Sequence, residues 1–167
     1  MVNVVSQFIY CDPDFCNGCG ICELACSGFK EKRYGPMLSR IRTVELGFLM
    51  HMAVACRHCE DPPCVAACPL EALKVSRDTK MVTVDGDRCI GCAWCIQACP
   101  YGAIFLDLTK KSVFLCDLCK EELEKGNKPR CIVTCPQEAL TLVTAAALAT
   151  KLRSTAVSHI QEEEKIV

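Results

Sequence analysis

Cysteine is the residue type that could do chemistry in this chain, since 17 of its 167 residues are cysteines and all but one of them fall into four groups. We call these groups quartets one to four, because each holds four thiols, the number that binds one [4Fe–4S] cluster. The pattern therefore predicts four [4Fe–4S] clusters and electron transfer. In chain order, the quartets are Cys16, Cys19, Cys22 and Cys26; Cys56, Cys59, Cys64 and Cys68; Cys89, Cys92, Cys95 and Cys99; and Cys116, Cys119, Cys131 and Cys135.

The spacing within the quartets favours iron–sulfur clusters. Quartet three reads C-x2-C-x2-C-x3-C-P, the run of bacterial ferredoxins, in which three thiolates bind one cluster and the fourth binds its neighbour. Gly18 and Gly91 precede the second cysteine of their quartets, where a sharp turn must curl the loop around the cluster. Proline follows quartets two, three and four and fixes the chain direction, whereas Ser27 follows quartet one.

Two other uses of cysteine compete with this interpretation. Disulfides are disfavoured because the number of cysteines is odd and the N-terminus lacks the pattern of a secretion signal. Zinc is the stronger rival, since the C-x2-C-x11-C-x3-C spacing of quartet four resembles a zinc ribbon. A zinc-stabilised interaction module thus stays open as an alternative, although zinc ligands usually come in two well-separated pairs.

Composition and motifs narrow the function further. Aromatic residues make up only 6% of the chain, so we expect the clusters to nucleate folding. The net charge of −1 argues against nucleic acid or an anionic membrane as the main partner, and no apolar run reaches transmembrane length. No nucleotide-binding or zinc-protease motif occurs, and we expect no catalytic residues. The chain is predicted to be cytoplasmic, not to be inserted in a membrane, to work under anaerobic conditions, and not to be an enzyme on its own.

Short strands bounded by polar turns must position the cysteines. Runs of apolar and β-branched residues predict two hairpins, a later single strand, a strand pair before quartet two, and a short charged helix with a loop inside quartet four. The hairpins are expected at 73–76 with 81–85 and at 104–107 with 112–115, the single strand at 140–143, the strand pair at 39–44 with 47–52, and the charged helix and loop between Cys119 and Cys131.

The C-terminal segment predicts an amphipathic helix that begins near Thr144. Leu148, Leu152, Ala156 and Ile160 recur every four residues along it. We expect this helix to pack on its own domain, and the alternative is a helix that docks on a partner subunit.

Quartets two and three resemble the four-cluster polyferredoxin subunits of anaerobic oxidoreductases. The resemblance rests on C-R-H-C-E-D-P-P-C-V-A-A-C-P, from Cys56 to Pro69, and on C-I-G-C-A-W-C-I-Q-A-C-P-Y-G-A-I, from Cys89 to Ile104, and it extends over about residues 8–145. Such subunits serve molybdopterin enzymes such as dimethyl sulfoxide reductase and formate dehydrogenase. Similar ones serve carbon monoxide dehydrogenase, hydrogenases and tungsten enzymes of the aldehyde ferredoxin oxidoreductase type, which include a class of benzoyl-CoA reductase.

The resemblance implies an α+β fold, a duplicated bacterial-ferredoxin-like fold of short β-hairpins and one-turn helices around the clusters. Residues 8–55 and 111–145 would form an outer two-cluster unit, 56–110 an inserted inner unit, and 146–167 a C-terminal helix. The implied ligand sets, called clusters A to D below, are Cys16, Cys19, Cys22 and Cys135 for A; Cys26, Cys116, Cys119 and Cys131 for B; Cys56, Cys59, Cys64 and Cys99 for C; and Cys68, Cys89, Cys92 and Cys95 for D.

The resemblance also implies a role as an electron-transfer subunit. Its partners would be a catalytic oxidoreductase subunit in a hetero-oligomer, with a tungsten or molybdenum enzyme of the aldehyde-oxidoreductase type preferred, and an external ferredoxin or other redox partner. A free soluble polyferredoxin is the alternative, disfavoured because simple carriers tend to be smaller and more acidic.

A few other residues carry expectations of their own. Cys11 is expected to be a small buried hydrophobe on a strand. Trp94 is expected to pack beside its loop, and His58 to donate to cluster sulfur or face solvent. Basic residues beside ligands could raise cluster potentials by their charge; these are Arg57, Lys120 and Arg130.

Overall fold

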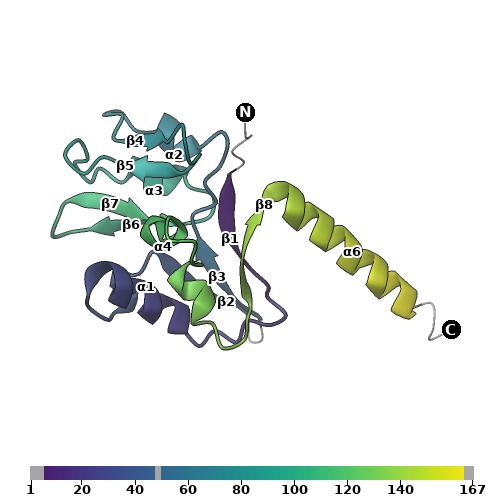
Figure 1. The fold of residues 1–167 in the computed structure, drawn as a ribbon. Coiled ribbons are helices and arrows are strands. Elements are labelled where there is room, and N and C mark those ends of the chain that lie inside the picture. The colour runs from purple at the N-terminus through teal and green to yellow at the C-terminus, as the bar shows by residue number, and fades with distance from the viewer. Residues whose placement is uncertain (1–5, 48–49, 164–167) are drawn as a thin grey trace.

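Four two-stranded antiparallel sheets and a set of short helices make up the part of the chain that the computed structural model describes, residues 6–47 and 50–163 (Figure 1). This mixture of helices and small antiparallel strands agrees with the α+β prediction. The strands are β1 (Gln7–Cys11), β2 (Ile41–Leu46), β3 (Met50–Ala55), β4 (Leu73–Val75), β5 (Val82–Val84), β6 (Ile104–Asp107), β7 (Ser112–Leu115) and β8 (Leu140–Thr144). The helices are α1 (Ile21–Glu31), the 3-10 helix η1 (Pro36–Leu38), α2 (Pro63–Ala66), α3 (Trp94–Ala98), α4 (Lys120–Leu123), α5 (Arg130–Val133) and α6 (Ala145–Glu163).

The predicted hairpins are confirmed. β4 pairs with β5 so that Leu73 lies opposite Val84, and β6 pairs with β7 so that Ile104 lies opposite Leu115. The expected strand pair before quartet two is also present as β2 and β3, shifted by two or three residues toward the C-terminus. Residues 48–49, which belong to the predicted second strand, lie outside the described part.

The first and last strands of the body pair with each other. β1 runs antiparallel to β8, with Gln7 opposite Thr144 and Cys11 opposite Leu140. Both strands are short, and Figure 1 shows them side by side at the edge from which α6 departs. This long-range pairing joins the segment before quartet one to the segment after quartet four.

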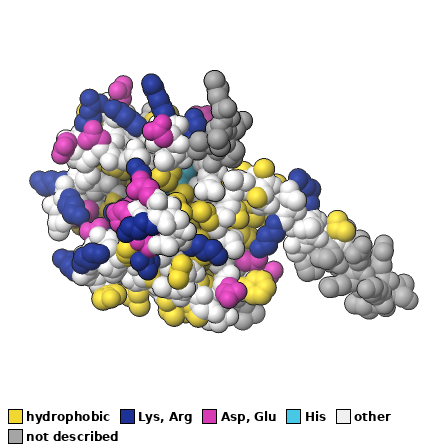
Figure 2. Space-filling view, viewed as in Figure 1, with side chains coloured by type: hydrophobic (Ala, Val, Ile, Leu, Met, Phe, Trp, Pro, Cys, Tyr) yellow, Lys and Arg dark blue, Asp and Glu magenta, His cyan; other side chains and the backbone are white. Residues whose placement is uncertain are grey.

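The core combines thiols with small and branched apolar side chains. Ile41, Leu73 and Leu118 are among its most deeply buried members, and many quartet cysteines lie between them. Basic and acidic side chains are interspersed over the face of the body that Figure 2 shows, as the net charge of −1 leads one to expect. In the described residues, no helix is both long and apolar enough to cross a membrane.

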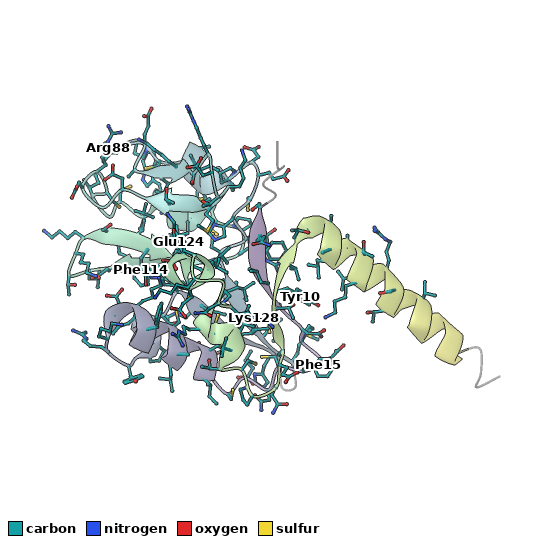
Figure 3. All side chains as sticks on the ribbon, viewed as in Figure 1. Tyr10, Phe15, Arg88, Phe114, Glu124 and Lys128 are labelled. Atoms are coloured by element: carbon teal, nitrogen blue, oxygen red, sulfur yellow. The ribbon has the colours of Figure 1, made fainter. Side chains whose placement is uncertain are left out.

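The expectation that the C-terminal helix packs on its own domain is wrong. α6 points away from the body in Figure 1, and the side chains of Leu152 and Val157 are about half exposed, at 50% and 54%. Its first turns are attached through Lys151, whose Nζ lies 3.0 Å from Asp12 Oδ2 and 5.3 Å from the centre of the Tyr10 ring (Figure 3). The four-residue apolar repeat correctly predicted a helix, but an apolar stripe alone does not specify what covers it.

Candidate iron–sulfur centre

Four C-x2-C loops share one backbone feature, a left-handed residue directly before the second cysteine. The φ angles are 71° at Gly18, 45° at His58, 71° at Gly91 and 55° at Leu118. This conformation turns the loop back on itself. In loops two and four, the N–H of His58 and that of Leu118 point at the sulfur of the loop's first cysteine, each at 3.4 Å. A glycine in the sequence therefore indicated two of these four turns, and no glycine indicated the turns at His58 and Leu118.

Two cavities are each lined by four cysteines. One has about 310 Å³ of empty space and is lined by Cys16, Cys19, Cys22 and Cys135, together with residues such as Ala53. The other has about 300 Å³ and is lined by Cys68, Cys89, Cys92 and Cys95. In each cavity, three cysteines of one quartet are joined by one cysteine of another quartet. Within the described ranges, no three or more histidine, cysteine or acidic side chains are grouped tightly enough to hold a single metal ion, whereas the four cysteines of a [4Fe–4S] cluster each bind a different iron.

The cysteines of the other two sets also lie close enough to repel one another as thiolates. Burial, together with the neighbouring charges of Cys64, Cys99 and Cys59, raises the pKa of Cys56 to about 12. Burial likewise raises the pKa of Cys131, and the charges of Cys119, Cys26 and Cys22 add to the increase. Charge interactions thus connect Cys56 with the other cysteines expected for cluster C, and connect Cys131 with cysteines expected for clusters B and A.

Burial makes eight of the sixteen quartet thiols poor acids until a positive centre binds them. It raises the pKa of Cys22 to about 12, that of Cys64 to about 11, and that of Cys116 well above its ordinary value. Iron–sulfur ligands are thiolates, and thiol ligands lose their protons when they bind a metal. A donor set of buried cysteines around cavities fits a [4Fe–4S] cluster, whose irons would replace those protons.

Backbone N–H groups are directed at the sulfurs of cluster D. Burial raises the pKa of Cys68 and Cys89, but hydrogen bonds outweigh it and lower both values below the ordinary one. The leading donors are Ala72 N–H, 3.3 Å from Cys68 Sγ, and Val113 N–H, 3.5 Å from Cys89 Sγ. Such donors stabilise negative charge on sulfur and are one means by which a protein adjusts cluster potential.

His58 is fully buried, so the expectation that it might face solvent is wrong. Its Nδ1 accepts the N–H of Val82 at 3.0 Å and lies 3.7 Å from Cys56 Sγ. Nδ1 is therefore unprotonated and Nε2 carries the proton. Burial lowers the pKa of His58 to about 4. Nε2–H is buried without a hydrogen-bond partner among the described residues, which leaves a donor free beside the cysteines of cluster C.

The structure also places the remaining candidate residues. Cys11 is buried at the end of β1, as predicted. Trp94 is 58% exposed at the start of α3, so the prediction that it packs beside its loop is wrong. The guanidinium of Arg57 lies 4.7 Å from the centre of the Phe8 ring, where it packs on aromatic surface.

Lys120 and Arg130 form ion pairs with acidic residues that lie between Cys119 and Cys131. Lys120 Nζ lies 3.7 Å from Glu124 Oε1 on the surface. Arg130 Nη2 lies 2.9 Å from Oε2 of the buried Glu122. Both basic residues therefore face an acidic partner, and Glu122 also pairs with Lys125, whose Nζ lies 3.6 Å from Glu122 Oε1.

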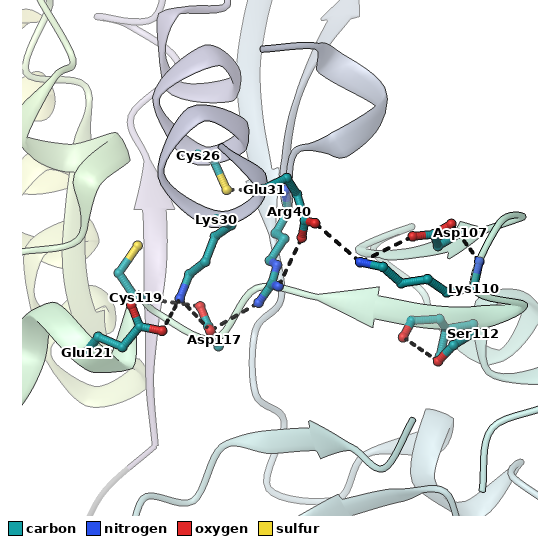
Figure 4. Close-up of polar contacts among 11 residues, drawn as sticks. Cys26, Lys30, Glu31, Arg40, Asp107, Lys110, Ser112, Asp117, Cys119 and Glu121 are labelled. Carbon is teal, nitrogen blue, oxygen red and sulfur yellow. Dashed lines mark hydrogen bonds and ion pairs between the residues drawn. The ribbon is translucent and has the colours of Figure 1, made fainter. Parts of the chain in front are cut away.

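Sequence reasoning missed a group of charged residues around Cys26 and Cys119. Lys30 on α1 and Arg40 both pair with Asp117, which lies inside the C-x2-C loop of quartet four (Figure 4). One signal was available: Lys30 follows Cys26 by four residues, which is one helical turn, and Asp117 directly follows Cys116.

A family model described as a 4Fe-4S dicluster domain matches residues 48–145. Among curated proteins, a subunit of the anaerobic dimethyl sulfoxide reductase of Escherichia coli (strain K12) is 37% identical over 144 residues, covering 78% of this chain and 70% of the relative. The polyferredoxin-like subunit of the aliphatic sulfonate oxidoreductase of Pyrococcus furiosus is 39% identical over 140 residues, covering 82% and 78%. A subunit of the sulfite dehydrogenase of Allochromatium vinosum is 34% identical, covering 77% and 64%.

Solved structures include similar chains as well. A chain of the active site complex BamBC of benzoyl coenzyme A reductase aligns with a TM-score of 0.49 and 23% identity, covering 83% of this chain and 76% of that one.

Proposed function

Because this protein belongs to the 4Fe-4S dicluster family, among the iron–sulfur electron-transfer subunits of oxidoreductases, we propose how its cysteines are used and what they connect. The chain is not itself catalytic. It binds four [4Fe–4S] clusters, each of which accepts and releases one electron, and it relays electrons between a catalytic subunit and an external redox partner.

The proposed ligands are the sixteen quartet cysteines, divided into the sets defined above for clusters A to D. For A and D, the support is that each set of four lines a single cavity. For C, the support is the charge interaction of Cys56 with the other three cysteines of the set, and for B that of Cys131 with Cys119 and Cys26, which acts alongside a weaker one with Cys22 of set A. Every set draws cysteines from two quartets, so each cluster would fasten two separate segments of chain.

We propose a duplicated ferredoxin fold with an outer unit at 8–55 and 111–145, an inner unit at 56–110 and a helical extension at 146–167. The pairing of β1 with β8 supports the outer unit, since it joins the two segments assigned to it. The hairpin of β4 and β5, between quartets two and three, supports the inner unit.

The proposed catalytic partner is a tungsten or molybdenum enzyme of the aldehyde-oxidoreductase type in a cytoplasmic hetero-oligomer, and the external partner is a ferredoxin. Support for a catalytic partner comes from the relatives, which are named as parts of reductases, dehydrogenases and oxidoreductases. A free polyferredoxin carrier remains the second candidate.

The two cavities that are each lined by four cysteines carry the proposal, and strictly anaerobic affinity purification tests it. We expect about sixteen irons per chain and as much sulfide, with a stoichiometric companion chain that contains tungsten or molybdenum. Recovery of the chain alone with full iron would favour the free carrier. Zinc without sulfide would overturn the function altogether.

A further inference from the structure

His58 is a fully buried polar residue whose backbone and ring are held in one position. It lies in the C-x2-C loop of quartet two with a φ of 45°. Its N–H donates to Cys56 Sγ at 3.4 Å, and its carbonyl oxygen accepts a hydrogen bond from the hydroxyl of Ser6. In the ring, Nδ1 accepts the N–H of Val82 at 3.0 Å. Every polar atom of this residue except Nε2 therefore has a partner.

The hydrogen bond from Val82 fixes which ring nitrogen carries the proton. A backbone N–H can only donate, so Nδ1 offers its lone pair and Nε2 holds the hydrogen of the neutral ring. Nε2–H is one of two buried side-chain donors that lack a partner among the described residues; the other is Nε of Arg40, whose terminal nitrogens form ion pairs. A buried donor without an acceptor is costly, so Nε2–H indicates an acceptor that the functional protein supplies.

The acceptor that fits this position is an inorganic sulfide of cluster C. His58 lies between Cys56 and Cys59, two of the ligands proposed for that cluster, so its ring begins inside the loop that would surround the cluster. Cys56 Sγ lies 3.7 Å from Nδ1, but no cysteine sulfur among the described residues accepts from Nε2. A [4Fe–4S] cluster brings sulfide ions of its own, and these accept hydrogen bonds.

The other three C-x2-C loops have no side-chain donor at the same place. The residue before the second cysteine is Gly18 in loop one, Gly91 in loop three and Leu118 in loop four. Leu118 matches His58 closely, since its φ is 55°, its side chain is 2% exposed, and its N–H lies 3.4 Å from Cys116 Sγ. Leucine thus satisfies the backbone and the packing of this position, and of the four residues only histidine adds a donor.

We propose that the Nε2–H of His58 donates a hydrogen bond to a sulfide of cluster C and raises the reduction potential of that cluster. The proposal rests on the ligand set of the proposed function. Reduction places one electron on cluster C, taken from a neighbouring reduced cluster that is thereby oxidised, and the proton stays on Nε2 throughout. The hydrogen bond stabilises the added negative charge on sulfur, and the exclusion of water strengthens it.

The test is a potentiometric titration of the intact complex, followed by electron paramagnetic resonance, with His58→Leu. This variant should fold and keep its clusters, because Leu118 occupies the equivalent position of loop four. We expect the midpoint of one cluster to fall by at least a threefold change in its reduction equilibrium, which is about 28 mV for one electron. Cys59→Ser alters a proposed ligand of cluster C, so the signal that it changes identifies this cluster.

Two further variants separate the donor of the imidazole from its acceptor. His58→Asn places an amide oxygen near the position of Nδ1, where it can accept the Val82 N–H, but it leaves no donor at the position of Nε2. His58→Gln extends its amide to that position and keeps a donor there. We expect His58→Asn to lower the midpoint as His58→Leu does, and His58→Gln to keep it closer to the wild-type value.

His51→Leu is the matched control. His51 lies against loop one, where a Cβ at Gly18 would lie 2.7 Å from its Nδ1, and it is not part of the quartet two loop. Its replacement also removes an imidazole, but it should leave the midpoint of cluster C unchanged.

Histidine labelled with nitrogen-15 tests the hydrogen bond directly. Pulsed electron paramagnetic resonance of the reduced complex should detect a labelled nitrogen coupled to cluster C in the wild type, and this signal should disappear in His58→Leu. A water molecule bound to Nε2 in place of the sulfide would give neither the coupling nor the shift, and would overturn the proposal.

Other results would overturn it as well: an unchanged midpoint of cluster C in His58→Leu, a shift of a different cluster alone, or equal midpoints in His58→Asn and His58→Gln. If every variant loses iron, the labelled wild-type complex decides, and the absence of a histidine nitrogen coupled to the cluster refutes the proposal. Four reducible clusters in the wild type keep the proposed function intact in each of these cases. Fewer than four would refute that function itself.

Discussion

Single residues decide how each C-x2-C loop makes its turn. The left-handed residue is glycine where another group lies against the loop, since a Cβ at Gly18 would lie 2.7 Å from His51 Nδ1, and one at Gly91 would lie 2.9 Å from the carbonyl oxygen of Lys111. In the other two loops the side chains of His58 and Leu118 point into the core and are buried. The available space, more than the turn itself, selects glycine.

Gly18→Ala and Gly20→Ala test this distinction. Both glycines have φ 71°, so alanine should cost about 1–2 kcal/mol at either position through backbone strain. Only Gly18→Ala adds a clash with His51, because a Cβ at Gly20 meets nothing within 4 Å. We expect the larger loss of stability for Gly18→Ala, measured as anaerobic denaturation followed by cluster absorbance.

Replacing His51 with alanine as well should remove the part of that loss due to the clash. Equal losses for the two single variants, or no recovery in the double variant, would show that the turn alone requires glycine at position 18.

At the scale of elements, α1 explains why serine replaces proline after quartet one. The helix continues through Cys26 to Glu31, whereas α2, α3 and α5 end before the last cysteine of their quartets. Ser27 therefore lies inside a helix, where proline would lose a hydrogen bond and clash with the preceding turn. Its buried hydroxyl donates to Glu23 O at 2.9 Å and accepts the N–H of Gly35 at 3.3 Å.

Ser27→Pro should therefore break α1 and cost about 3 kcal/mol or more. The matched control is Pro69→Ser, in a turn after α2, which should stay within about 1 kcal/mol of the wild type because no helix continues there. Iron content and thermal denaturation of both variants provide the measurement. A stable Ser27→Pro protein with four clusters would contradict the explanation that the continuing helix α1 excludes proline at position 27.

The strand β8 and the helix α6 are adjacent in the chain but differ in their attachment to the body. Leu140 on β8 is 3% exposed, whereas Leu152 on α6 is 50% exposed. Leu140→Glu should prevent folding because it buries an unpaired charge, and Leu152→Glu should change stability by no more than about 0.5 kcal/mol. Circular dichroism and iron analysis would check this, and strong destabilisation by Leu152→Glu would show that α6 packs on the body.

At the scale of the whole molecule, the core depends on its ligands. Many of its buried residues are quartet cysteines, and four small sheets of two strands offer little apolar surface of their own. Removal of the clusters by an iron chelator under anaerobic conditions should therefore abolish most of the circular dichroism signal of the fold. Iron and sulfide should restore it. An apo protein with an unchanged spectrum would show that the strands hold the body together without the clusters.

The sequence predicted the local elements well and the contacts between them less well. The hairpins followed from short apolar runs bounded by polar turns, such as Ile104–Asp107, whose partner strand is a few residues away. Whether α6 packs on the body and whether Trp94 is buried depend on the neighbouring elements, and the periodicity of the sequence does not specify these neighbours. The pairing of Lys30 with Asp117 joins positions far apart in the chain, and only the folded structure brings these charges together.

The pairing of β1 with β8 also bears on biosynthesis. Residues 7–11 leave the ribosome well before their partners at 140–144 are made. Throughout that interval β1 presents an unpaired edge to the cell, open to proteases and chaperones. Nascent chains stalled before residue 140 should therefore be cleaved near β1 in limited proteolysis, and chains that include residues 140–144 should be protected there.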